Sequence, residues 1–150
     1  MASRFSLPIA RNNAILFVDM AYHFDNALRR ALLENIDSFK DRRGSEDGLR
    51  HAAVSIVVVG DGDEAAFLLT KRSPRLNAHS GQFALPGGRV DEGETALEAA
   101  LREMREEINV SLTSDHLVGT LDDYPTRSGY RITPFVFWAG EEIKPEANPG

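Results

Sequence analysis

Three glutamates in the second half of the chain are spaced so that a helix would place them on one arc. Glu103, Glu106 and Glu107 lie at positions i, i+3 and i+4, which are neighbours on a helix surface. Clustered carboxylate oxygens are the ligands that Mg²⁺ and Mn²⁺ prefer. Arg102 lies four residues from both Glu98 and Glu106, so we expect it to bridge them. The spacing alone leaves two interpretations open, a metal site and a merely acidic surface.

A glycine-rich segment leads directly into the acidic helix. Residues 85–94 read LPGGRVDEGE, and glycines let a backbone approach an anion or a metal ion closely. The segment is not a P-loop, because no Gly-Lys-Ser/Thr follows, and the dinucleotide-binding pattern G-x-G-x-x-G is absent. The loop and the three glutamates therefore favour a metal and phosphate site over an acidic surface.

The elements that must position this site alternate between strands and one central helix. Residues 94–108 predict a helix, because five apolar residues recur at the 3.6-residue period. Short runs rich in β-branched or aromatic residues predict strands on both sides of it. The expected strands are 53–59, 64–71, 82–85, 117–122 and 132–138, with a turn at 60–63. This order predicts a mixed α/β sandwich.

The N-terminal third has a different pattern. Residues 14–40 predict one helix, and residues 41–48 a polar linker punctuated by glycine. The apolar stripe of this helix consists of Leu28, Ala31, Leu32, Ile36 and Phe39. We therefore divide the chain into a helical extension with its linker, 1–48, and a main domain, 49–150.

Composition excludes several classes of function. The 150 residues include no cysteine and carry a formal net charge of −6, which excludes disulfides, thiolate metal sites and cysteine nucleophiles. An acidic surface does not attract nucleic acid or an anionic membrane. The longest apolar run, 52–60, is far shorter than the roughly 20 residues of a membrane-spanning helix. We expect a cytoplasmic protein that binds small molecules.

The glycine loop and the acidic helix together resemble a known family motif. Gly88, then Glu94, then Arg-Glu-Met-Arg-Glu-Glu at 102–107 resemble the Nudix box, G-x5-E-x7-R-E-U-x-E-E-x-G-U, where U is apolar. Asn109 replaces the last glycine, and asparagine also tolerates the left-handed conformation that ends a helix. The resemblance implies a Nudix-type α/β/α sandwich with a mixed β-sheet, here with an N-terminal helical extension. It also implies a metal-dependent diphosphatase.

The same resemblance implies a role for each matching residue. Arg102 would orient a catalytic carboxylate, Glu94 would brace the junction of loop and helix, and Glu106 would act as the base. The implied catalytic set is Glu106, Arg102 and Glu103. The implied ligands of Mg²⁺ or Mn²⁺ are the carboxylates of Glu103, Glu106 and Glu107, with a carbonyl of Gly87 or Gly88.

Segments outside the box resemble the coenzyme A pyrophosphatase branch. These are LLTKRS at 68–73, HSGQ at 79–82 and GYRITP at 129–134, whereas Asn77 stands where the branch usually has arginine. The implied substrate is coenzyme A or an acyl thioester. The implied substrate-binding residues are Arg72, His79, Gln82 and Arg131. The alternatives are hydrolysis of ADP-ribose, dinucleotides or damaged nucleoside triphosphates, and a non-catalytic nucleotide-sensing module.

The last six residues, 145–150, are loop-like. Family members generally continue from this point with another strand and a C-terminal helix. We therefore expect an exposed sheet edge, which favours pairing with a second copy of the chain as a homodimer.

Overall fold

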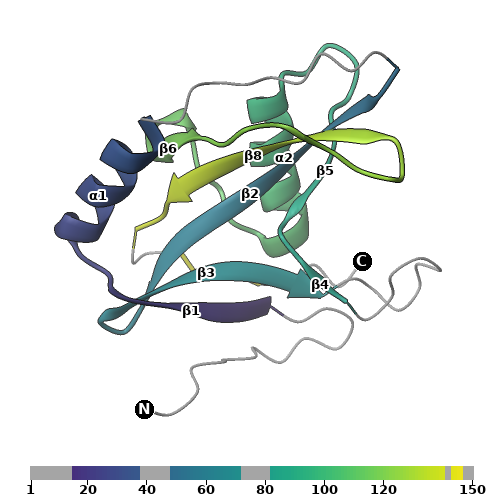
Figure 1. Ribbon diagram of the computed structural model, residues 1–150. Coiled ribbons are helices and arrows are strands. Elements are labelled where there is room, and N and C mark those ends of the chain that lie inside the picture. Colours follow the sequence, from purple (N-terminus) through teal and green to yellow (C-terminus); the bar gives the residue numbers. More distant parts are fainter. Residues whose placement is uncertain (1–14, 38–47, 72–81, 141–142, 147–150) are drawn as a thin grey trace.

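A mixed β-sheet lies between two helices (Figure 1). The computed structural model describes residues 15–37, 48–71, 82–140 and 143–146. In chain order its elements are β1 (Ile15–His23), α1 (Asn26–Asp37), β2 (Arg50–Asp61), β3 (Glu64–Lys71), β4 (Phe83–Ala84), β5 (Gly87–Arg89), α2 (Ala96–Ile108), the short 3₁₀ helix η1 (Ser114–His116), β6 (Leu117–Thr120), β7 (Tyr124–Pro125) and β8 (Tyr130–Trp138).

The sheet is built around one parallel pair of strands. Its main strand order is β1-β3-β2-β8-β6, while β4 pairs with β3, β5 with β2 and β7 with β8. β2 and β8 run parallel, with Arg50 opposite Tyr130 and Val58 opposite Trp138. The other pairings are antiparallel. The parallel pair needs a crossover, and α2 lies in the connection between the two strands.

The two faces of β2 serve different helices, because successive side chains of a strand point to opposite faces. Ala53 and Val57 belong to the core cluster that contains Met104 of α2. Val58 belongs to a second cluster that contains Ile36 of α1. The structure therefore confirms a mixed α/β sandwich with a helix on each face.

The prediction of one helix over 14–40 is wrong in its first half. Ile15–His23 is strand β1, which pairs antiparallel with β3, and the helix begins only at Asn26. Ile15 is fully buried in the core. The Leu28 N–H donates to the Asp25 carboxylate at 2.8 Å, so Asp25 caps the new helix. The apolar stripe that suggested a helix starts only at Leu28, and Phe39 of that stripe lies outside the described residues.

The elements around the acidic helix are confirmed. Strands form at all five expected places, and β3 has the expected bounds. α2 begins at Ala96, two residues later than expected, and ends on Asn109, whose φ of 56° and ψ of 36° are left-handed. The turn predicted from asparagine at that position is therefore present. Of the expected linker, 41–48, residues 41–47 lie outside the described residues. Among the described residues, no helix is long and apolar enough to cross a membrane.

Candidate functional site

The start of α2 is fixed by a reciprocal cap. The Thr95 hydroxyl accepts a hydrogen bond from the Glu98 N–H at 3.1 Å, and the Glu98 carboxylate accepts one from the Thr95 N–H at 3.1 Å. This capping box satisfies donors that a helix start leaves without partners. The bridge expected between Arg102 and Glu98 is therefore not formed, because Glu98 serves the cap and Arg102 pairs elsewhere.

Arg102 joins the glycine-rich loop to the acidic face of α2. Its Nε and Nη2 donate to the two carboxylate oxygens of Glu94 at 2.8 and 3.0 Å. Its Nη1 donates to Glu103 at 2.9 Å and to Glu106 at 3.3 Å. Nη2 also donates to the carbonyl oxygen of Arg89 at 3.0 Å. One guanidinium thus orients two of the three clustered carboxylates and holds the loop against the helix.

The ion pair between Arg102 and Glu94 shifts the pKa of both groups. Hydrogen bonds from Arg102 lower the pKa of Glu94 below its ordinary value, against the opposing effect of burial, and the Asp91 N–H assists. The Glu94 carboxylate in turn raises the pKa of Arg102, as does Glu103. Both side chains are mostly buried, with 15% and 20% of their surfaces exposed. The pair is therefore charged over the whole physiological range.

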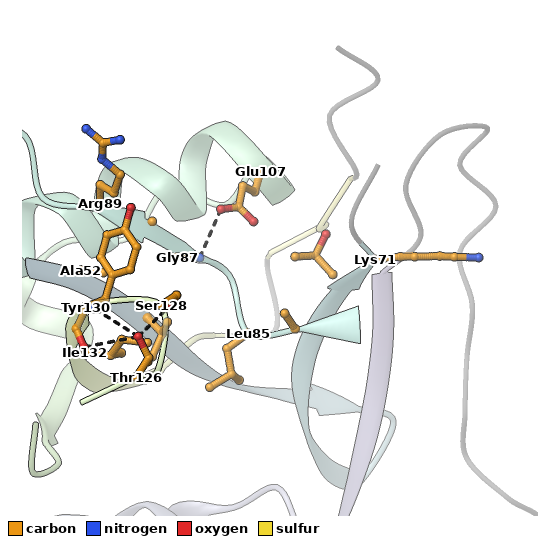
Figure 2. Close-up of a pocket in the computed structure, with 14 residues that line it drawn as sticks. Ala52, Lys71, Leu85, Gly87, Arg89, Glu107, Thr126, Ser128, Tyr130 and Ile132 are labelled. Carbon is orange, nitrogen blue, oxygen red and sulfur yellow. Dashed lines mark hydrogen bonds between the residues drawn. The ribbon is translucent and has the colours of Figure 1, made fainter. Parts of the chain in front are cut away.

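Gly87 and Gly88 let the loop lie directly against α2 and β2. The Gly87 N–H donates to the Glu107 carboxylate at 3.2 Å (Figure 2). A Cβ added at Gly88 would lie 2.4 Å from Oε1 of Glu103. A Cβ added at Gly87 would lie 2.3 Å from the carbonyl oxygen of Ala53 on β2. Only glycine leaves room at both positions, so the backbone reaches two of the three clustered carboxylates.

A cavity of about 660 Å³ opens beside this junction (Figure 2). Glu107 and the two glycines line one side, and Arg89 and Lys71 lie on opposite sides of it with their side chains extending outward. The remaining lining residues are Ala52, Val54, Thr70, Ala84, Leu85, Thr126, Ser128, Tyr130 and Ile132. Its volume is in the range of cavities that bind nucleotides and other small molecules.

The donor chemistry of the acidic face fits a hard divalent cation, since three carboxylates share one arc beside a glycine backbone. The close approach of Gly88 to Glu103 supports this fit, because it brings the main chain of the loop beside a carboxylate. Among the described residues, however, no group of three or more histidine, aspartate or glutamate side chains is gathered tightly enough to hold a metal ion. In this arrangement Arg102 supplies the positive charge to Glu103 and Glu106.

The residues expected to bind substrate are only partly described. Arg72 and His79 lie outside the described residues. Gln82 is exposed and directly precedes β4, and it does not line the cavity. Arg131 lies on β8 between two cavity-lining residues, Tyr130 and Ile132, so its side chain points to the opposite face. Its Nε lies 3.4 Å from a carboxylate oxygen of Asp123.

The cavity also has lining residues that the motif did not single out. Thr126 and Ser128 belong to the turn between β7 and β8, where their hydroxyls lie 2.9 Å apart. Tyr130 follows this turn, and the Arg50 guanidinium lies 4.7 Å from the centroid of its ring. Lys71 and Arg89 lie within segments that the sequence had marked, 68–73 and 85–94. Their place within those segments was the available signal for Lys71 and Arg89. No local signal placed Thr126 and Ser128 at the cavity, because their turn reaches it only once the sheet has formed.

The chain resembles proteins of one family along most of its length. The family model described as the NUDIX domain matches residues 49–149. An uncharacterized Nudix hydrolase, NudL, from Yersinia enterocolitica is 35% identical over 121 residues, which are 78% of this chain and 62% of that protein. Nudix hydrolase 3 of Caenorhabditis elegans is 39% identical over 114 residues, covering 73% and 47% of the two chains. The chain thus spans less than two thirds of the length of these relatives.

Solved structures show the same fold. The crystal structure of a C. elegans Ap4A hydrolase binary complex superposes with a TM-score of 0.54, and 20% of the sequence is identical. The match covers 65% of this chain and 72% of that one. At this identity the likeness concerns the fold alone.

Proposed function

This chain belongs to the Nudix domain family, and we propose that it hydrolyses the diphosphate bond of a nucleoside-diphosphate-linked metabolite with the help of a divalent cation. The proposal rests chiefly on one observation. The Gly87–Gly88 backbone lies directly against Glu103 and Glu107 at the edge of a cavity of about 660 Å³. We take this arrangement as support for oxygen ligands beside the space that a diphosphate would occupy.

Each residue of the acidic face has a part in this proposal. Glu103, Glu106 and Glu107 would hold Mg²⁺ or Mn²⁺, with a carbonyl of Gly87 or Gly88. When bound, such a cation neutralises the phosphate oxygens and makes water more acidic. Arg102 keeps Glu103 and Glu106 in place through its anchor on Glu94. We assign proton removal from water to Glu106, because its side chain is 56% exposed and that of Glu103 only 18%.

We propose coenzyme A or an acyl-coenzyme A as the substrate. The segments at 68–73, 79–82 and 129–134 support this assignment through their resemblance to the coenzyme A pyrophosphatase branch, and Tyr130 of the last segment lines the cavity. Water would attack one phosphorus, and the bridging oxygen would leave with the other phosphate. The products are adenosine 3′,5′-bisphosphate and 4′-phosphopantetheine, which keeps the acyl group on its sulfur when the substrate is an acyl-coenzyme A.

Other substrates of the same chemistry are the competing hypothesis. ADP-ribose, dinucleotides and damaged nucleoside triphosphates would present the same diphosphate to the same carboxylates. A Nudix module that binds a nucleotide without turnover is the second alternative. The paired and ordered glutamates support catalysis over this sensing role.

A substrate panel tests the proposal. Coenzyme A, acetyl-coenzyme A, ADP-ribose and a diadenosine polyphosphate would each be incubated with the protein and Mg²⁺ or Mn²⁺, and the products resolved by chromatography. We expect adenosine 3′,5′-bisphosphate from coenzyme A, and loss of turnover when EDTA removes the metal. Removing one such carboxylate should reduce the rate by two orders of magnitude or more, so Glu106→Gln should be nearly inactive.

The matched control is Glu92→Gln, the same change at an exposed glutamate of the loop that precedes α2. It should retain the wild-type rate. Turnover of ADP-ribose but not of coenzyme A would reassign the substrate. Metal-dependent binding of these compounds without turnover of any would support the sensing module instead.

A further inference from the structure

A second hollow, of about 420 Å³, adjoins the candidate cavity. Val54 and Leu85 line both hollows, so the two spaces are neighbours across these side chains. The other residues that line the second hollow are Ile56, Leu121, Asp122, Tyr124 and Pro134. We call this second hollow the apolar annex.

The floor of the cavity continues into the annex without interruption. In the parallel pairing of β2 and β8, Ala52 lies opposite Ile132 and Val54 lies opposite Pro134. Even-numbered residues of both strands point to the same face. Ala52 and Ile132 line the cavity, Val54 lines both hollows and Pro134 lines the annex. Each step of two residues advances about 6.6 Å along the strands. A ligand arm that leaves the cavity along this strip therefore enters the annex.

Further along the same face, α1 closes the strip. Val58 and Val136 belong to the core cluster that α1 covers through Ile36, and Ile56 and Leu121 pack against that cluster. The annex thus lies between the candidate site and a packed apolar core. It continues the cavity along the sheet as far as the apolar cluster that contains Ile36 of α1.

The walls of the annex favour an apolar occupant. They are aliphatic apart from Asp122 and the ring of Tyr124, whose side chain is 43% exposed. Burial of part of the Tyr124 ring raises the pKa of its phenol. A sugar would lose hydration for its hydroxyls here and find few partners in return. An alkyl group loses no hydrogen bonds and gains the free energy of apolar burial.

We propose that the apolar annex binds the uncharged, apolar arm that a diphosphate-linked substrate carries on the phosphate opposite its nucleoside. It thereby favours such substrates over those with a second sugar or a free terminal phosphate. The inference rests on the proposed function for the position of the diphosphate beside Glu107. It adds a determinant of substrate class that lies outside the Nudix box.

Binding of alkyl esters of ADP measures the effect directly. Methyl, butyl and octyl esters of the methylene-bridged ADP analogue, which cannot be hydrolysed at the bridge, would be titrated into the protein with Mg²⁺ by calorimetry. Each buried methylene should tighten binding about fourfold, so we expect the butyl ester to bind at least tenfold more tightly than the methyl ester. Equal dissociation constants for the three esters would overturn the proposal.

Two variants locate the effect in the annex. Leu121→Trp fills the hollow, and Ile56→Thr removes the terminal methyl group of a wall side chain and replaces its γ-methylene by a hydroxyl. Both should reduce the gain from methyl to butyl, and Leu121→Trp should abolish it. If Leu121→Trp melts below the assay temperature, Ile56→Thr alone decides. If the folded variants gain as much affinity from the methyl to the butyl ester as the wild type does, the proposal is overturned. The control is Leu33→Trp, at a residue of α1 that is 39% exposed and lines neither hollow.

Hydrolysis of ordinary ADP esters, which have oxygen instead of methylene between the two phosphorus atoms, separates the annex proposal from the proposed function. If the methylene-bridged analogues bind more tightly with longer alkyl chains but no ordinary ester is cleaved, the annex proposal holds and the proposed function is overturned. If every ordinary ester is cleaved at the same rate and the methylene-bridged analogues bind equally, the annex proposal is overturned and the proposed hydrolysis holds.

Discussion

Arg102 and Glu94 form a two-point ion pair between α2 and the loop that precedes it, with N–O distances of 2.8 and 3.0 Å. The same guanidinium donates to Glu103 and Glu106. Because one side chain spans both segments, a change at Glu94 acts on the stability of the fold and on the positions of the carboxylates.

Glu94→Gln should lower the free energy of unfolding by about 1–2 kcal/mol, because it keeps the shape of the side chain but leaves Arg102 without its main counter-charge. Urea denaturation at neutral pH measures this loss. Asp91→Asn is the control, since the Asp91 carboxylate lies 3.5 Å from Arg102 and is 69% exposed. It should cost less than about 0.5 kcal/mol. Equal losses in the two variants would contradict the assignment.

The contribution of Glu94 should disappear in acid. Hydrogen bonds from Arg102 hold the pKa of folded Glu94 below its ordinary value of 4.5, so the unfolded chain takes up this proton more readily than the folded one. The stabilisation is therefore fully present above about pH 4.5 and is lost as the pH falls further, through the folded pKa. Urea denaturation of wild type and Glu94→Gln between about pH 6 and pH 3 should show their difference shrink. A difference that stays constant over this range would refute the linkage.

Alanine at the two loop glycines should have opposite consequences. At Gly88 the new Cβ meets the flexible end of Glu103, so Gly88→Ala should displace that carboxylate and lower kcat at least tenfold, with little change in Tm. At Gly87 the Cβ meets the backbone of Ala53, so Gly87→Ala should destabilise the fold by about 1–3 kcal/mol. Thermal denaturation and rate measurements on both variants check this. Two equally stable variants would show that the sheet accommodates the Gly87 methyl.

Substitution of Asn109 should follow its left-handed backbone. Asn109→Gly should stabilise the protein or leave it unchanged, because glycine adopts this conformation without a steric penalty. Asn109→Ala should cost about 1 kcal/mol, because alanine pays the full penalty of positive φ. Chemical denaturation of the two variants measures the difference. The reverse order of stability would place the role of Asn109 in its side chain.

The sequence carried enough local information to predict α2 and its surroundings. The apolar stripe of α2 falls at one period, and the Asn109 turn follows from the residue type alone. Thr95 and Glu98 also match the pattern of a capping box, which explains why Glu98 is unavailable to Arg102. Helical spacing suggested Glu98 because it considers only neighbours on the same helix. Helical spacing could not predict the contact between Arg102 and Glu94, because Glu94 lies in the loop that precedes the helix.

Features that depend on distant pairings were not predictable. Ile15 is a strand residue because it pairs with Thr70 of β3, which lies some fifty residues later in the chain. Nothing within residues 14–40 marks that pairing, and the helical stripe beginning at Leu28 extended the predicted helix too far upstream. The cavity was not predictable for the same reason, because Tyr130 and Leu85 line it together only after the sheet has formed.

The parallel pairing of β2 with β8 also governs when the protein can fold. Arg50 pairs with Tyr130 and Val58 with Trp138, so each bridge joins residues 80 positions apart. The ends of such a long segment meet only at a considerable loss of chain entropy, and contacts of this range slow folding. During synthesis, β2 and β3 leave the ribosome long before β8, so the edge of β2 that pairs with β8 has no partner strand at first. Until β8 pairs with β2, the strip that forms the floor of both hollows lacks the residues of β8, so we expect this surface to be among the last parts of the molecule to form.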